Sequence, residues 1–200
     1  MINTTPHTPT AICKWENKYP NFFHEYDNMW APIFKRVFKT VRNTKLQTLQ
    51  YRIIHRIVPC NYWLNNLKIK DNNLCSFCNN IDDISHFFLR CGKAEQLWQY
   101  FFNWWKNITK IDIIGIFPNY LEEYVLFGFP FENNCMKALN FCIAHVKNYI
   151  YHQKKLGVES LDLYTCHCKI KAALDIEHKI CTKKQTPTFF KRFEVIYDSL

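Results

Sequence analysis

The sequence predicts a mainly α-helical fold, and three observations lead to that prediction. Only four glycines occur among 200 residues, so tight hairpins and glycine-rich loops are scarce. Apolar residues make up 48% of the chain, which is enough for a core at this length. In several segments these residues recur at three- and four-residue steps, the period of a helix with one buried face. We therefore expect helices that pack through aromatic and aliphatic side chains.

The clearest helix of the N-terminal half is expected over residues 44–58. Thr44 and Gln47 have the spacing of a capping box, and Pro59 ends the apolar repeat. Its buried face should be formed by four residues, which are Leu46, Leu49, Ile53 and Ile57. Basic residues recur at similar spacing beside this face, so a positively charged stripe should lie next to the apolar one.

Three more helices are expected toward the C-terminus. The apolar repeat over 94–108 predicts the first of them. Residues 110–131 contain two glycines and two prolines, so we expect a loop or a short extended piece there. The second helix should cover 134–156 and end at Gly157, with lysines in its last turn. The third should run over 160–181, with a serine as its cap.

The segment CSFCNNIDDISHFFLRC, residues 75–91, has the spacing of a metal site. Two cysteines with two residues between them can direct both thiolates to one point, and the following histidine and cysteine can complete a tetrahedron. We therefore expect a closed Cys3His site for one structural Zn²⁺, with Cys75, Cys78, His86 and Cys91 as ligands. Asp82 and Asp83 lie between these ligands and are expected in a solvated loop rather than as partners of the ligands.

A second group of cysteines and histidines is expected to pack within a helix instead of binding metal. It comprises Cys166, His167, Cys168, His178 and Cys181. The pattern of this segment is helical, and neighbouring positions on a helix point in different directions. The remaining cysteines should be small apolar residues. No export signal is visible at the start, so the ten cysteines are expected as thiols in an intracellular protein of the nucleus or cytoplasm.

Positive charge is concentrated in one part of the chain. Between residues 28 and 70 there is no Asp or Glu. The Lys and Arg residues of this stretch carry nine positive charges, which is as much as the formal net charge of +9 of the whole chain. Such a block is typical of proteins that bind nucleic acid, with a solvated helical surface as the alternative. The expected phosphate contacts are Lys35, Arg36, Lys39, Arg42, Lys45, Arg52 and Arg56. No segment has the roughly 18 to 20 apolar residues of a membrane span, so no membrane partner is expected.

Four regions are expected from these patterns. They are a flexible tail over 1–12, a basic, aromatic-rich helical segment over 13–70, a zinc knuckle over 71–93 and a C-terminal helical segment over 94–200 that packs on the rest. The fold class is thus mainly α, a helical domain with an inserted small Cys3His zinc knuckle.

The run TKLQTLQYRIIHRIVPCNYWLNNLKIKDNNLCSFCNNIDDISHFFLRCGKAEQLW resembles a known family. It is similar to the zinc-binding region that follows the reverse transcriptase domain in LINE-type non-LTR retrotransposon polyproteins, and the similarity extends over about residues 13–155. Cys60 stands where that family usually has Thr. The residues that match the family pattern are Gln50, Tyr51, His55, Arg56, Ile57, Pro59, Asn61, Leu74, Cys75, Cys78, His86, Cys91 and Trp98.

The resemblance implies a C-terminal part of a reverse transcriptase that helps to hold RNA template or target DNA. It does not imply catalysis, because the Tyr/Phe-x-Asp-Asp polymerase motif is absent and Asp82 and Asp83 lie inside the knuckle. We expect a non-catalytic module, with a zinc-braced scaffold that docks to a polymerase core as the alternative. A nuclease site formed by Glu177 and Lys179 with Asp162 or Asp175 is disfavoured. Such carboxylate-lysine sites normally lie on strands, whereas the pattern of this segment predicts a helix.

Overall fold

The computed structural model describes residues 10–24, 29–130, 133–158 and 160–197. Within these ranges the chain is helical and forms no β-strand, so the expected mainly α fold is confirmed. The elements are α1 (Thr10–Lys18), α2 (Pro20–His24), α3 (Trp30–Thr40), α4 (Thr44–Ile54), α5 (Asn61–Asn66), the π turn η1 (His86–Arg90), α6 (Gly92–Thr109), α7 (Ile113–Ile116), α8 (Leu121–Phe127), α9 (Asn134–Leu156), α10 (Leu163–Lys183) and α11 (Thr188–Tyr197).

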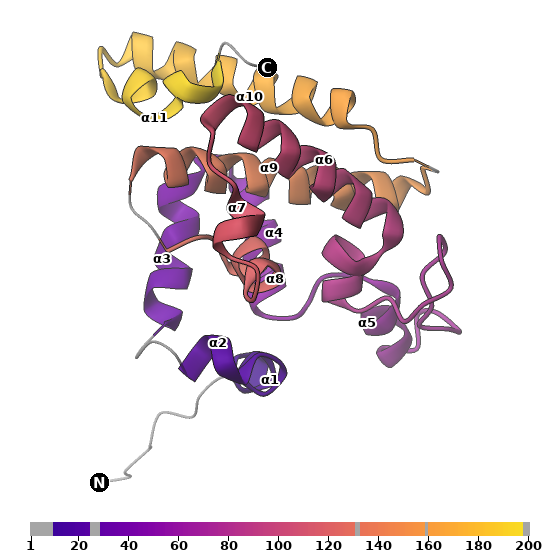
Figure 1. Cartoon of the computed structure of the whole chain (residues 1–200). Coiled ribbons are helices and arrows are strands. Elements are labelled where there is room, and N and C mark those ends of the chain that lie inside the picture. The colour runs from indigo at the N-terminus through magenta and orange to yellow at the C-terminus, as the bar shows by residue number, and fades with distance from the viewer. Residues whose placement is uncertain (1–9, 25–28, 131–132, 159, 198–200) are drawn as a thin grey trace, which may run out of the picture.

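Helix α9 runs through the middle of the molecule (Figure 1). It packs against α10 and α11 on one side and against α3 and α4 on the other, and its C-terminal part reaches η1. Buried residues lie on all of its faces, as expected for a helix covered on every side. The Asn133 side chain caps its start by accepting from the Met136 N–H at 2.7 Å, and Gly157 ends it in a left-handed conformation with φ 70°. The expected helix over 134–156 is therefore confirmed at both ends.

Helix α6 joins the metal-ligand segment to the core. Leu97, Phe101 and Trp105 are fully buried on the face that the apolar repeat predicts. Trp98 Nε1 donates to the Phe88 carbonyl at 2.7 Å, which fixes the helix against η1. Since α6 also packs on α10 and α11, the knuckle and the C-terminal helices share one continuous core.

Helix α4 is shorter than the sequence suggests. It ends at Ile54, and Arg56 beyond it has a positive φ of 57°, a conformation that stops a helix. Ile57 is consequently outside the helix and 39% exposed. The cap also lies one residue earlier than expected, because the Asn43 side chain accepts from the Lys45 N–H at 2.9 Å, while Gln47 donates to the Val41 carbonyl. The prediction of a helix over 44–58 with a Thr44 cap was wrong in these details.

The loop expected over 110–131 is not found in the described residues 110–130, since they contain α7 and α8. Asp112 caps α7 by accepting from the Gly115 N–H at 3.1 Å. Helix α8 is buried along most of its length, so burial outweighs the unfavourable glycines and prolines around it. The cap of α10 is Asp162 rather than Ser160, because Asp162 accepts from the Thr165 N–H at 2.6 Å.

The N-terminal end of the described chain is already helical. Helix α1 begins at Thr10, inside the region 1–12 that was expected to be a flexible tail, while residues 1–9 lie outside the described ranges. No helix in the described ranges is both long and apolar enough to cross a membrane.

Candidate metal centre

A short hairpin places the first two cysteines. Leu74 and Ile81 form an isolated antiparallel bridge. Inside it, the Cys75 N–H donates to the Asn80 carbonyl at 2.7 Å and the Asn79 N–H donates to the Cys75 carbonyl at 2.9 Å. Asn79 adopts a positive φ of 58°, which turns the chain back after Cys78. The turn thus brings the two cysteines to one end of the hairpin.

The π turn η1 places the other two ligands. The Cys91 N–H donates to the His86 carbonyl at 3.0 Å, a bond that spans five residues and defines the π geometry. In an α-helix, residues five apart would point about 140° away from each other. The wider turn brings them closer to the same side, so the histidine and the third cysteine can face the hairpin.

The four ligand atoms fit one zinc ion. The Sγ atoms of Cys75, Cys78 and Cys91 and a ring nitrogen of His86 lie within 4.8 Å of one another. The Cys75 and Cys91 sulfurs are 3.9 Å apart, and the Cys78 sulfur is 3.2 Å from His86 Nε2. A tetrahedral zinc ion with ordinary bond lengths requires about 3.8 Å between two sulfurs and about 3.6 Å between sulfur and nitrogen. Three thiolates and an imidazole therefore converge as a closed structural site requires.

The site lies at the edge of the core. Cys75, His86 and Cys91 are buried, while Cys78 is exposed. Burial raises the pKa of the Cys75 thiol to about 11, so a metal ion must displace a tightly held proton there. Burial lowers the pKa of His86, which favours the neutral ring that can donate a lone pair to a metal.

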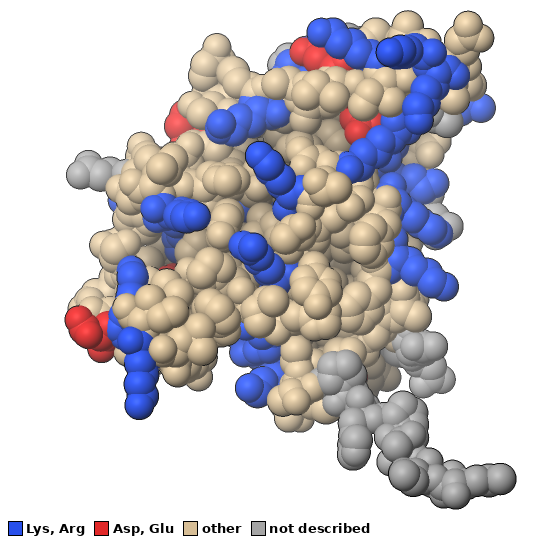
Figure 2. All heavy atoms as spheres, turned by 180° about the vertical axis from the view of Figure 1, so that it is seen from behind, with Lys and Arg blue, Asp and Glu red and all other residues tan. Residues whose placement is uncertain are grey.

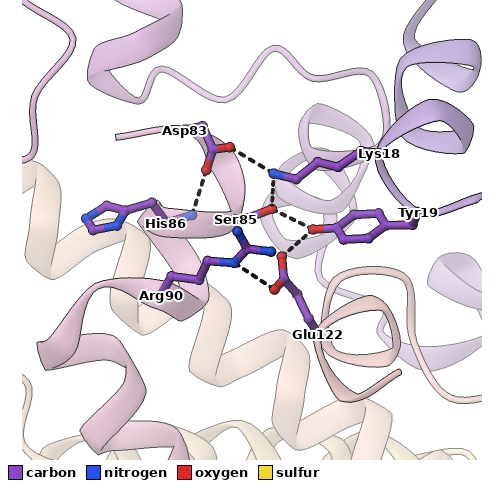
Figure 3. Close-up of polar contacts among 7 residues, drawn as sticks. All are labelled: Lys18, Tyr19, Asp83, Ser85, His86, Arg90 and Glu122. Atoms are coloured by element: carbon purple, nitrogen blue, oxygen red, sulfur yellow. Dashed lines mark hydrogen bonds and ion pairs between the residues drawn. The ribbon is translucent and has the colours of Figure 1, made fainter. Parts of the chain in front are cut away.

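A polar network holds η1 against α1 and α8 (Figure 3). Asp83 accepts from the His86 backbone N–H at 2.8 Å and from Lys18 Nζ at 2.8 Å, and Lys18 also reaches Ser85 Oγ at 2.7 Å. Tyr19 contacts Ser85 at 2.7 Å and donates to Glu122. Arg90 completes the network with an ion pair to Glu122 at 2.9 Å. The His86 ring points away from these groups, so the network orients its backbone and leaves the imidazole for the metal.

The protonation of this network follows from its contacts. Burial acts to raise the pKa of Asp83, but hydrogen bonds from the His86 N–H and Lys18 outweigh it and hold that pKa below its ordinary value. Burial, followed by the hydrogen bond to Glu122, raises the pKa of Tyr19 well above its usual range. Asp83 is thus an anion and Tyr19 a neutral donor at physiological pH.

Asp82 is also part of the folded structure. Its side chain is only 5% exposed, and it accepts from the Asn61 N–H at 3.0 Å at the start of α5. The expectation that Asp82 and Asp83 lie in a solvated loop was therefore wrong. The Asp83 carboxylate holds the backbone of the ligand His86, and the Asp82 carboxylate ties the ligand segment to the start of α5.

The second group of cysteines and histidines does not form a comparable cluster. In the described part of the chain, the Cys3His residues are the only group of three or more His, Cys, Asp or Glu side chains whose ligand atoms converge. Cys166 and Cys181 are buried on α10, whereas Cys168 is exposed. The ring centres of His167 and Trp104 are 4.5 Å apart. The interpretation of these side chains as packed helix residues agrees with this arrangement.

Three of the expected phosphate contacts share one cleft. Lys35, Arg36 and Lys39 of α3 line a cleft of about 250 Å³ together with Lys137 of α9. Among the described residues, no Asp or Glu lines it. Arg36 also donates to the carbonyl of Phe127 at 3.1 Å and to that of Gly128. Lys137 was missed by sequence analysis, because it lies outside the basic block and only the packing of α3 on α9 brings it there.

The other four expected contacts have different surroundings. Lys45 is exposed in the first turn of α4, and Arg42 lies 3.6 Å from Glu177. Arg52 donates to the Tyr151 hydroxyl at 3.5 Å. The Arg56 guanidinium lies 4.2 Å from the centre of the Trp15 ring. The expected stripe is therefore not continuous, because α4 ends before Arg56 and the arginines contact other parts of the protein.

The face seen in Figure 2 is nevertheless rich in positive charge. Lys and Arg side chains are spread over much of it, and Asp and Glu appear in few places. Some aromatic side chains are exposed as well, since Tyr51 is 51% exposed and Tyr62 is 41% exposed.

The carboxylates considered for a nuclease are engaged in the helical fold. Asp162 caps α10, and Asp175 accepts from the Tyr197 hydroxyl at 3.0 Å. Glu177 faces Arg42. All the residues of that set lie on α10 or at its cap rather than on strands.

Comparison with known families finds a match in the first half of the chain. Residues 14–98 match the model of a protein family described as zinc-binding in reverse transcriptase. The matched range contains all four ligand residues, so the family and the geometry together assign the cluster to one structural zinc ion. No curated protein and no solved structure matches the chain.

Proposed function

We propose that this chain, whose residues 14–98 match the zinc-binding region of reverse transcriptases, is a non-catalytic nucleic-acid-binding module. It derives from the C-terminal part of a non-LTR retrotransposon reverse transcriptase and acts in the nucleus or cytoplasm. Its zinc ion is structural, because four protein ligands leave no position for substrate. Its role is to help hold RNA template or target DNA.

The observation that carries this proposal is the cleft between α3 and α9. It is lined by four cations, Lys35, Arg36, Lys39 and Lys137, and by no Asp or Glu among the residues that the structure describes. Clustered lysines and arginines attract the phosphate backbone, and such contacts position a strand without reading its sequence. Binding through this cleft should therefore depend strongly on salt and weakly on base sequence.

A second cleft supports the binding of single strands. It has a volume of about 350 Å³, and its lining includes Lys14, His55, Arg56, Tyr62 and Trp63, together with the Asp83 carboxylate. Cations beside aromatic rings are the combination by which proteins hold unpaired bases and their phosphates. Since Tyr62 is 41% exposed, its ring is open to stacking from solvent.

The test is RNA binding by the full zinc-loaded chain, measured by fluorescence anisotropy across a salt series. With four to six phosphates neutralised, the log-log slope of affinity against salt for a single strand should be about −3 to −4. A slope near zero, or no binding at low salt, excludes the proposal.

A second candidate is a zinc-braced scaffold that docks to a polymerase core. Large apolar side chains on the surface favour it, among them Phe38 at 67%, Leu156 at 75% and Tyr164 at 76% exposed. It is also favoured by the contacts that four of the expected phosphate-binding arginines make within the protein. These are Arg36, Arg42, Arg52 and Arg56, and their contacts compete with phosphate for the guanidinium groups. Binding to a reverse transcriptase core without RNA binding would select this alternative.

A further inference from the structure

Lys154, in the last turn of α9, is buried beside the metal-ligand segment. Its side chain is 3% exposed, and its Nζ makes no hydrogen bond in the described structure. The nearest carboxylate oxygen, Asp82 Oδ1, is 3.8 Å away and has no hydrogen-bond partner either. An ammonium group removed from water in this way is unfavourable unless negative charge surrounds it.

The surroundings of Lys154 come from the knuckle. Its Nζ lies 4.6 Å from the ring centre of Phe87 and 5.8 Å from that of Phe77. Phe77 lies between the two cysteines of the hairpin, and Phe87 follows His86 directly. Lys154 and Cys75 also line the same cleft, of about 280 Å³. The last turn of α9 therefore packs against residues that flank three of the four ligands.

A zinc ion in this site leaves an excess of negative charge. Three thiolates carry one more negative charge than Zn²⁺ balances, and the neutral imidazole of His86 adds none. Asp82 adds a further negative charge on the same side.

We infer that Lys154 is the counter-charge of the zinc centre. Its ammonium balances the excess charge of the zinc-bound thiolates, and zinc binding in turn holds the end of α9 against the knuckle. This role goes beyond nucleic-acid binding and does not depend on it. It also separates Lys154 from Lys155, which is exposed and follows it in the sequence. The usual role of both lysines as cations at a helix end does not explain the burial of one of them.

Pairing with Asp82 alone does not account for Lys154. The distance of 3.8 Å between Lys154 Nζ and Asp82 Oδ1 is too long for a hydrogen bond, and the other oxygen, Oδ2, accepts from the Asn61 N–H at 3.0 Å. If Lys154 served Asp82 alone, its loss would weaken the zinc-free and zinc-loaded chains equally. If it serves the thiolates, its loss must lower zinc affinity itself.

The experiment measures zinc affinity of the full chain by competition with a chromophoric chelator. The variants are Lys154→Met, which keeps the length of the side chain without its charge, and the matched control Lys155→Met. Asp82→Asn is the third variant, because asparagine still accepts from the Asn61 N–H but removes a negative charge. Circular dichroism in excess zinc checks that each variant retains its helices.

We expect Lys154→Met to lower zinc affinity about 10- to 100-fold, the usual effect of losing a partner next to the ligands. Lys155→Met should stay within about threefold of the parent chain, and Asp82→Asn should bind zinc at least as tightly as the parent. Equal affinities for the two lysine variants overturn the inference. If Lys154→Met does not fold, the zinc affinity of Asp82→Asn tests the inference by itself. Affinity equal to or above that of the parent chain supports the role of Lys154 as counter-charge, and a tenfold loss contradicts it.

Discussion

The backbone N–H of Cys91 donates to the carbonyl of His86 across five residues, at 3.0 Å. This π bond brings two ligands of one helical turn toward the hairpin that carries Cys75 and Cys78. Single turns of this kind are rare and often occur at functional sites, where they redirect side chains that an α-helix would point apart. The geometry of the turn thus depends on residues that the zinc ion would hold, which makes metal content the first property to measure.

Substitution of a single ligand should remove the metal. Cys75→Ser or Cys91→Ser is expected to reduce zinc from one ion per chain to nearly none, because serine does not replace a thiolate in a structural site. Elemental analysis of the purified protein measures this. Cys168→Ser is the matched control, since Cys168 is exposed on α10 and outside the cluster. Full zinc content in Cys75→Ser would show that the cluster is not the metal site.

Chelation should unfold the knuckle before the rest of the protein. Residues 73–91 hold few backbone hydrogen bonds of their own, whereas α9 is covered on all faces. Removal of zinc by a chelator is therefore expected to speed amide hydrogen exchange over 73–91, with much less change in the middle of α9. Exchange that is the same with and without chelator would contradict a metal-dependent knuckle.

The parts predicted correctly from the sequence depend on local interactions. The C-terminal end of α9 could be read from Gly157, because a left-handed glycine acts on its own neighbours in the chain. The metal site could be predicted because its ligands lie close together in the chain, at a spacing typical of zinc sites. These ligands are Cys75, Cys78, His86 and Cys91.

The parts that were missed depend on contacts between distant segments. Helix α4 stops because Arg56 adopts a positive φ while its guanidinium packs on Trp15 of α1, which no local pattern reveals. Lys137 enters the cleft of Lys35 and Lys39 through the packing of α9 on α3. The burial of Lys154 could not be predicted either, since a lysine near a helix end is ordinarily solvated.

Lys147 should make stability depend on pH. It is buried in α9 and donates to Gln50 Oε1 and, at 3.0 Å, to the Leu126 carbonyl, and burial lowers its pKa from 10.5 to about 7. Between these values the unfolded chain binds more protons than the folded one, so stability rises with pH. We expect a gain of roughly 1.5 kcal/mol between pH 7 and 8.5, from a limiting slope of about 1.36 kcal/mol per pH unit.

Urea unfolding of the zinc-loaded chain at several pH values measures this gain. Lys147→Met should abolish it, and the exposed Lys155→Met should retain it. The comparison between variants is needed because burial raises the pKa values of Cys142 and Cys166, which makes stability fall as the pH rises toward their titration in the unfolded chain. Identical pH profiles for the two variants would show that Lys147 does not titrate differently on folding.

The cleft between α3 and α9 should dominate the salt dependence of RNA binding. Alanine at Lys35, Lys39 and Lys137 removes three cations that line it, while Arg36, which also holds the carbonyls of Phe127 and Gly128, stays in place. For a single strand, loss of three phosphate contacts should reduce the log-log salt slope by about 2. Anisotropy titrations of a labelled oligonucleotide over a salt series measure the slope.

The control for that variant removes the same charge elsewhere. Lys169, Lys179 and Lys183 lie on α10, and all three are exposed. Their replacement by alanine lowers the net charge equally, so a general electrostatic attraction would weaken by the same amount in both variants. Binding through the cleft predicts a much smaller change in slope for the α10 variant. If the two triple variants lose equal slope, the positive charge acts as a diffuse field and the cleft is not a phosphate site.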